Sequence, residues 1–160
     1  MVGLSLLVLV VIVVIAAAIS SRSSSVRRLT FDQLQARDCL LGSGLGLNTY
    51  RPYRGGVTVV PCDQRHIAEV FFADNAWPRS LAFPGYYAIG IAASIRCESA
   101  FRAYDGIPVS ESIFDYGQVT PITAADWASG DRSVTCIAYE PTTQYPAGAP
   151  VSYSIKGSQR

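Results

Sequence analysis

Hydrophobic and polar positions divide the chain into three parts. Residues 2–19 (VGLSLLVLVVIVVIAAAI) carry no charge, and every Asp, Glu, Lys and Arg lies beyond them. Residues 20–28 (SSRSSSVRR) have almost no apolar side chain to bury, which is typical of a flexible linker. Farther on, apolar and polar positions follow the periods of strands and helices. The pattern predicts a membrane anchor over 1–20, a flexible tether over 21–30 and one domain over 31–160.

The length of the apolar segment favours a membrane span. Its eighteen residues make a helix of about 27 Å, close to the ~30 Å hydrocarbon core of a bilayer. A cleaved signal peptide is the alternative, because Ala16, Ala17 and Ala18 are small enough for a cleavage site. The apolar core of a signal peptide, however, is normally shorter than this segment and preceded by positive charge. We therefore expect a single-pass membrane protein.

The domain pattern predicts the α+β class, with a small antiparallel sheet, one main packed helix and a short second helix. Segments rich in β-branched and aromatic residues indicate the strands. A glycine-rich loop is expected over 42–56. The four candidate strands cover 57–61, 66–73, 133–140 and 151–155.

Two helices are expected. The main helix, over 86–104, should bury one stripe and expose its charged residues. The second helix follows Thr123, with Asp126 at the capping-box offset and Gly130 at its end. The buried stripe of the main helix comprises Ala93, Cys97, Ala100, Phe101 and Tyr104, and its expected exposed residues are Arg96, Glu98 and Arg102.

Charge and motifs exclude several classes of partner. The net charge is +1 with acids and bases interspersed, so neither a nucleic-acid footprint nor a polybasic membrane patch is present. The GxGxG of the glycine-rich loop precedes an expected strand rather than a helix, which disfavours phosphate binding. No nucleophile-elbow GxSxG is present either. We expect no catalytic residue, no metal ligand and no cofactor.

His66, the one histidine of the chain, lies four residues after Cys62 and raises three chemical hypotheses. A zinc site needs about four ligands, usually in close pairs, and only Cys62 and His66 are close. A Cys–His nucleophile needs a free Cys62 thiolate, which an even cysteine count disfavours. Residues three apart on a strand face opposite ways, which disfavours a His66–Glu69 dyad. We expect His66 to order the turn after Cys62 through a side-chain hydrogen bond.

The cysteines and the basic residues predict opposite topologies. Four widely spaced cysteines are typical of two structural disulfides in an oxidising compartment. Arg22, Arg27 and Arg28 follow the apolar segment, and the positive-inside rule would therefore keep the domain in the cytoplasm. We give the cysteines more weight and expect the domain on the extracytoplasmic side of the cell membrane.

Several motifs together resemble the septum-formation family of actinobacterial envelope proteins. The resemblance covers about residues 37–158, and its most specific parts are C-x3-H-x2-E-V-F from Cys62 and W-x2-G-D-R-x3-C from Trp127. The family typically has an N-terminal span, and its name implies a role in division-septum or cell-wall assembly. The motifs that carry the resemblance are ARDCL, VVPCDQRHIAEVF, FPGYY, SIRCESAFRAY and ADWASGDRSVTCIAY. We interpret as structural the motif residues His66, Glu69, Trp127, Gly130, Asp131 and Arg132.

The expected elements predict the cysteine pairing. Cys39 lies on a first short strand and Cys62 at the end of the next, so antiparallel pairing brings them together. Cys97 lies on the inner stripe of the main helix, and Cys136 shares a strand face with other small apolar residues. Cys39 is therefore expected to pair with Cys62, and Cys97 with Cys136. The residues that share the strand face with Cys136 are Val134 and Ala138.

The W-x2-G-D-R stretch is expected to form a corner. We expect Trp127 to be buried, Gly130 to reverse the chain, and Asp131 and Arg132 to hydrogen-bond across the turn. The alternative is an Arg132 that binds an anionic wall fragment or a partner.

Residues 75–87 are the better candidate for contact with another molecule. They are aromatic and interrupted by proline, so they form either a platform for sugars or a partner, or a lid on the core. Their aromatic residues are Trp77, Phe83, Tyr86 and Tyr87.

These observations leave three classes of function in a definite order. The first is an extracytoplasmic interaction module with a protein partner in a division or envelope complex. The second is a ligand-binding or sensor domain for a cell-wall precursor or glycan. The third is an enzyme, which should show paired acids in a cleft.

Overall fold

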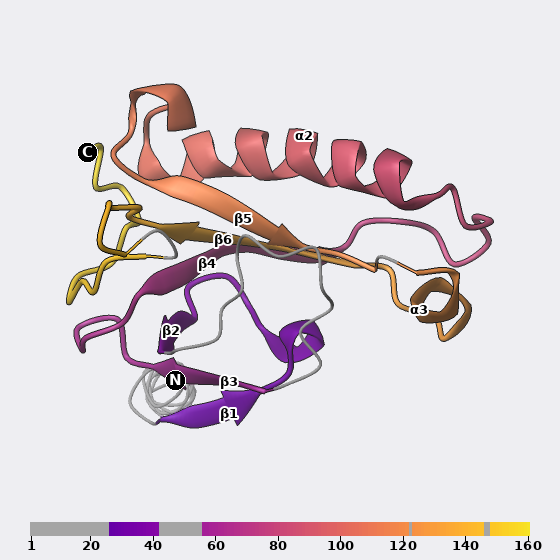
Figure 1. Ribbon diagram of the computed structural model, residues 1–160, viewed down its shortest axis with the longest axis horizontal. Coiled ribbons are helices and arrows are strands. Elements are labelled where there is room, and N and C mark those ends of the chain that lie inside the picture. Colours follow the sequence, from indigo (N-terminus) through magenta and orange to yellow (C-terminus); the bar gives the residue numbers. More distant parts are fainter. Residues whose placement is uncertain (1–25, 42–55, 122, 146–147) are drawn as a thin grey trace, which may run out of the picture.

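The fold is α+β and is built on one sheet. The computed structural model describes residues 26–41, 56–121, 123–145 and 148–160. Its strands are β1 (Arg27–Leu29), β2 (Cys39–Leu41), β3 (Val57–Val60), β4 (Ala68–Asn75), β5 (Asp115–Val119) and β6 (Ser133–Tyr139). All neighbouring strands are antiparallel, in the order β1-β3-β2-β4-β6-β5. A long helix, α2 (Tyr86–Asp105), lies across one face (Figure 1).

The predicted antiparallel sheet, main helix and short second helix are confirmed. Three of the four predicted strands are present with small shifts at their ends, and β2 is the short strand expected at Cys39. The predicted anchor and residues 42–55 of the predicted glycine-rich loop lie outside the described residues. No helix in the described ranges is long and apolar enough to span a bilayer.

The strand predicted over 151–155 was wrong. Only Val151 pairs, in an isolated bridge with His66. Beyond that bridge the chain turns, and Ser154 and Ile155 donate hydrogen bonds to Glu69 on β4. The polar groups of this segment therefore hydrogen-bond to a side chain and not to the backbone of a neighbouring strand.

The two edge strands were not predicted as strands. β1 lies within the predicted tether and pairs with β3, so residues 27–29 belong to the sheet. An ion pair between Arg27 and Asp38, 2.8 Å apart, connects β1 to the segment before β2. β5 contains Asp and Gly, which have low strand propensity, yet it pairs along most of β6. At both edges, pairing with an existing strand prevails over local propensity.

β6 separates two hydrophobic clusters. Val134, Cys136 and Ala138 face α2, as predicted, and pack with residues of α2 and β4. The alternate residues Ile137 and Tyr139 face the other way and pack with residues of β2, β3 and β4. Because side chains alternate along a strand, a strand buried on both faces is mostly apolar, and β6 is apolar except at Ser133 and Thr135. β6 is therefore the centre of the core.

Helix α2 covers the face formed by β4, β5 and β6. Its buried residues recur every four positions, and Ala100 and Tyr104 are half-buried beside them. Gly106 ends the helix in the left-handed conformation with φ 101°, which favours glycine. The predicted exposed residues Arg96, Glu98 and Arg102 are exposed. The buried residues are Ile89, Ala93, Cys97, Phe101 and Asp105.

The short helix α3 (Ala124–Ala128) has the predicted capping box. The Thr123 hydroxyl accepts a hydrogen bond from the Asp126 backbone N–H, and the Asp126 carboxylate accepts one from the Thr123 backbone N–H. Gly130 then turns the chain toward β6 with φ 95°. Two short 3-10 turns, η2 (Phe31–Gln33) and η3 (Val109–Glu111), complete the described elements.

Candidate functional site

Both disulfides are present with the pairing expected from the sequence. Cys39 is bonded to Cys62 and Cys97 to Cys136, with Cα–Cα distances of 5.3 Å and 5.6 Å. The second bridge joins α2 to β6 inside the core, whereas the first joins β2 to the turn after β3. Zinc ligation and nucleophilic catalysis both require a thiolate. Because Cys62 is a disulfide sulfur, neither hypothesis based on it applies to the oxidised protein.

His66 makes the side-chain hydrogen bond that the sequence predicts. The side chain is buried, and Nδ1 lies 2.7 Å from the Gln64 carbonyl, so Nδ1 carries the proton and donates to the turn after Cys62. The His66 backbone exchanges two hydrogen bonds with Val151. Nε2 has no hydrogen-bond partner among the described residues. His66 therefore connects the turn to the C-terminal segment.

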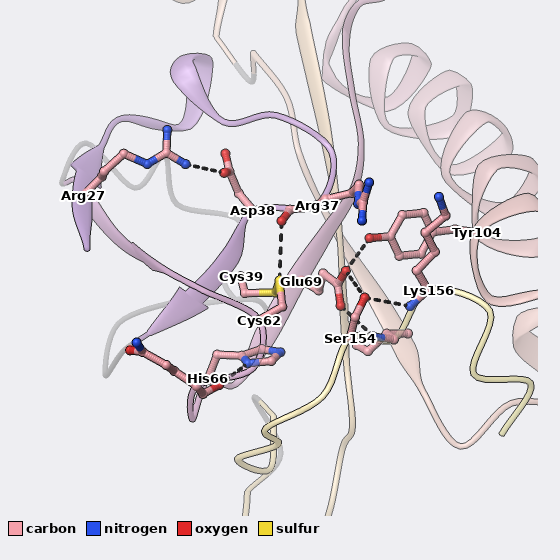
Figure 2. The surroundings of a disulfide bond; sticks show 12 residues. Arg27, Arg37, Asp38, Cys39, Cys62, His66, Glu69, Tyr104, Ser154 and Lys156 are labelled. Atoms are coloured by element: carbon pink, nitrogen blue, oxygen red, sulfur yellow. Dashed lines mark hydrogen bonds and ion pairs between the residues drawn. A yellow bond between two sulfur atoms is a disulfide. The ribbon is translucent and has the colours of Figure 1, made fainter. Parts of the chain in front are cut away.

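Glu69 is the centre of a buried polar network, which was not predicted from the sequence. It lies on β4 opposite Cys39 on β2, and its side chain is on the α2 face of the sheet. Figure 2 shows its carboxylate between the Cys39–Cys62 bridge and Tyr104. Oε1 accepts hydrogen bonds from the hydroxyls of Tyr104 and Ser154. Oε2 accepts one from the Ile155 backbone N–H, at 2.6 Å.

The network changes the acidity of Tyr104. Burial, followed by the hydrogen bond to Glu69 and the charge of that carboxylate, raises the pKa of Tyr104 far above its usual value. The hydrogen bond to Ser154 and the positive charge of Arg37 act in the opposite direction and are smaller effects on this pKa. Tyr104 therefore remains a neutral donor.

Two other tyrosines are also less acidic than usual. Burial raises the pKa of Tyr139, and the charge of Asp115 adds to that effect. Burial raises the pKa of Tyr153 as well.

No second carboxylate accompanies Glu69, whose three partners in the described chain are all donors. The paired acids expected of an enzyme are therefore not found at Glu69.

A second buried carboxylate holds the C-terminus against α2. Asp105 accepts hydrogen bonds from the hydroxyls of Ser112 and Ser158 and from the Gln159 backbone N–H. These contacts bring the last residues of the chain to the end of α2. The burial of Asp105 therefore depends on a segment that is distant in the sequence.

Trp127 and Arg132 form the centre of a packed corner. Trp127 is buried, and its indole N–H donates to the Leu81 carbonyl at 2.8 Å. The Arg132 guanidinium lies 3.8 Å from the centre of the Trp127 ring and donates to the carbonyls of Trp127 and Arg79. Arg132 is only 7% exposed. It is therefore committed to the corner and is not presented to an anion at the surface.

Asp131 takes part in the corner in a different way from that predicted. The Arg132 guanidinium donates to the Asp131 backbone carbonyl, and not to its carboxylate. The carboxylate accepts hydrogen bonds from the Ser133 backbone N–H and hydroxyl. The two residues are thus linked across the turn, but the Asp131 side chain fixes the start of β6.

The aromatic residues of the segment 75–87 divide into a packed group and a more exposed group at the start of α2. Trp77 and Phe83 each lie with their ring centres 5.8 Å from that of Trp127, so they cover the corner. Tyr86 and Tyr87 contact one another, with ring centres 5.4 Å apart. Tyr87 is 83% exposed. Among the predicted contact residues, Tyr87 is therefore the one most available to another molecule.

Tyr87 begins an exposed apolar stripe along α2. Ile91 and Ile95 follow at intervals of four residues, and they are 64% and 65% exposed. Residues four apart lie on the same helix face, so the three side chains form one row opposite the buried stripe. No charged residue occurs from 87 to 95. Tyr87 was a predicted contact residue, whereas Ile91 and Ile95 were not predicted; their spacing of four residues from Tyr87 is the signal in the sequence that indicates the row.

The fold and these contacts define the class as a small disulfide-stabilised α+β domain. No protein-family model matches the chain, and no significantly similar curated protein or solved structure was found.

Proposed function

We propose that this protein is a membrane-anchored extracytoplasmic interaction module that binds a protein partner through the exposed stripe of α2. The observation that carries the proposal is the row of Tyr87, Ile91 and Ile95, which leaves large apolar side chains in water on one face of a helix. Contiguous exposed apolar surface of this kind marks interaction sites. The Cys97–Cys136 bridge and the packing of Phe101 hold the helix on the sheet.

The position of the stripe favours a protein over the lipid bilayer as its occupant. The predicted anchor precedes β1, which is the edge strand at one side of the sheet. Helix α2 packs on β4, β5 and β6, at the other side (Figure 1). The stripe points away from the sheet and lies apart from the edge strand that follows the predicted anchor. A protein with an uncharged apolar surface, held in the same envelope complex, fits it best.

The resemblance to septum-formation proteins supports a division or cell-envelope complex as the setting. The motif residues His66, Glu69, Trp127 and Arg132 are all buried, so they maintain the domain that presents α2. The glycan-binding alternative has less support, because two aromatic rings of the candidate platform, those at 77 and 83, pack on the corner.

Site-specific crosslinking in native membranes tests the proposal. A photo-crosslinking residue at Ile91 is expected to capture a specific membrane or envelope protein. The same residue at Asp32, an exposed position in η2 on the opposite face of the sheet, is the matched control. Equal capture patterns at both positions, or no protein capture at Ile91, would contradict the proposal. Protease accessibility of the domain in intact cells tests its extracytoplasmic location separately.

A further inference from the structure

The two disulfides differ in exposure and in their surroundings. Cys97, Cys136 and Cys39 are completely buried, whereas Cys62 is partly exposed. The sulfur atoms of Cys39 and Cys62 and a carboxylate oxygen of Glu69 all lie within 4.8 Å of one another. We propose that the Cys39–Cys62 bridge is a thiol-exchange site, in which an external dithiol attacks Cys62 and Cys39 leaves beside Glu69.

The direction of attack follows from exposure. A thiolate must reach the sulfur that it attacks, and access is one of the factors that control the rate. Cys62 lies in a turn whose next three residues are exposed. Cys39 lies on β2 between β3 and β4, where an external thiol does not reach it. Cys62 is therefore the attacked sulfur, and the Cys97–Cys136 bridge remains closed while the domain is folded.

The sheet can retain its pairing when the bridge opens. Cys39 pairs with Val60 on one side and with Glu69 on the other, so backbone hydrogen bonds hold β2 in place. Cys62 lies beyond the last paired residue of β3. His66 holds the far end of the turn through its bridge with Val151. Opening therefore releases a short turn and does not require the domain to unfold.

Glu69 restrains the opening. All three of its hydrogen-bond partners donate to it, and the Ser154 hydroxyl accepts in turn from the Lys156 backbone N–H, which directs its proton toward the carboxylate. This arrangement suits an ionised carboxylate. A thiolate leaving on Cys39 would place a second negative charge beside it, in a buried region where like charges repel strongly.

The exchange is balanced in two steps. The external thiolate bonds to Cys62, the Cys39–Cys62 bond breaks, and its electron pair goes to Cys39, which takes a proton from water that enters as the turn opens. The second thiol of the external dithiol, as its thiolate, then attacks the external sulfur of the mixed disulfide, and Cys62 leaves and is protonated. The dithiol is oxidised by two electrons and the bridge is reduced by two.

Native-state reduction of the full-length chain in detergent micelles tests the site. Dithiothreitol is the probe, free thiols are alkylated, and peptide mapping identifies them. We expect Cys39 and Cys62 to be alkylated while Cys97 and Cys136 remain bonded. With glutathione, the mixed disulfide is expected on Cys62. Release of all four thiols together, earlier release of Cys97 and Cys136, or a mixed disulfide on Cys39 would overturn the proposal.

Two carboxylate variants test the restraint. Glu69→Gln is expected to speed opening of Cys39–Cys62 by about tenfold, because the like charge is removed. Asp105→Asn removes another buried carboxylate outside this cluster and is expected to leave that rate unchanged. An unchanged rate in folded Glu69→Gln would overturn the role of Glu69.

The Cys97–Cys136 bridge is the internal reference for both variants. Its simultaneous opening in Glu69→Gln would indicate unfolding. If that variant does not fold, the position of the glutathione adduct in the wild-type chain still decides which sulfur is attacked. Neither measurement depends on a partner bound to α2, so this site and the proposed function can fail separately.

Discussion

The hydroxyl of Tyr104, on the last turn of α2, donates a hydrogen bond to the buried carboxylate of Glu69 on β4. This contact joins the helix to the sheet beside the Cys39–Cys62 bridge (Figure 2). A buried carboxylate that loses a donor must either remain undersolvated or take up a proton. The contact therefore connects packing, charge and stability in one pair of residues.

Removal of the Tyr104 hydroxyl should destabilise the domain. Tyr104→Phe retains the ring but leaves Glu69 with one donor fewer, and we expect a loss of about 1–3 kcal/mol in unfolding free energy. Urea unfolding followed by circular dichroism measures it. Tyr87→Phe is the matched control, because the Tyr87 side chain is mostly exposed. A similar loss in both variants would argue against the buried contact.

Stability should also fall at alkaline pH. Burial and then Glu69 raise the pKa of Tyr104 above its ordinary value of 10.0. Below that pH the tyrosine is neutral in both folded and unfolded chains. Above it the unfolded chain loses the proton first, so stability falls by up to about 1.4 kcal/mol per pH unit. Unfolding free energies measured across this range should fall less steeply in Tyr104→Phe; identical slopes would contradict the assignment.

The disulfides should contribute substantially to stability. By loop-closure entropy, each bridge is expected to contribute about 3–4 kcal/mol. Replacing Cys97 and Cys136 together by Ala should lower the unfolding free energy by about that amount. Peptide mapping of the unreduced wild-type chain should recover Cys39–Cys62 and Cys97–Cys136. A linkage between Cys39 and either Cys97 or Cys136, or four free thiols, would contradict the pairing.

Truncation of two isoleucines on α2 should have very different effects on stability. Ile89 is completely buried and Ile91 is 64% exposed. Ile89→Ala should cost about 2–5 kcal/mol through the cavity that it creates. Ile91→Ala should change stability by about 0.5 kcal/mol or less, while reducing capture of the partner. Strong destabilisation by Ile91→Ala would show that this side chain is packed within the domain.

Replacement of Arg132 by lysine should lower the stability of the domain. Its planar guanidinium stacks on Trp127 and donates to carbonyls in more than one direction, which an ammonium group cannot reproduce. Arg132→Lys is expected to lower stability by about 1–3 kcal/mol, whereas Arg102→Lys, at an exposed position, should be neutral. Thermal unfolding of the two variants measures the difference, and equal melting temperatures would contradict the corner packing.

The sequence by itself predicted the features that depend on local periodicity. The helix over 86–104 follows from the spacing of Ala93, Cys97 and Phe101, and the short helix follows from the reciprocal cap of Thr123 and Asp126. The Cys97–Cys136 pairing followed from the same patterns, because a helix stripe and a strand face that are both apolar must meet in the core. The Cys39–Cys62 pairing followed from the antiparallel arrangement expected of two short successive strands.

Only the tertiary structure decided the features that depend on distant segments. β1 and β5 are strands because β3 and β6 offer backbone groups to pair with, which no local preference reveals. Residues 151–155 have strand-like composition, but Ser154 and Ile155 instead satisfy Glu69 on another strand. The exposed row on α2 and the unequal exposure of Cys39 and Cys62 likewise depend on what the rest of the chain covers. Periodicity determines which face of an element is apolar, whereas burial is a property of the assembled fold.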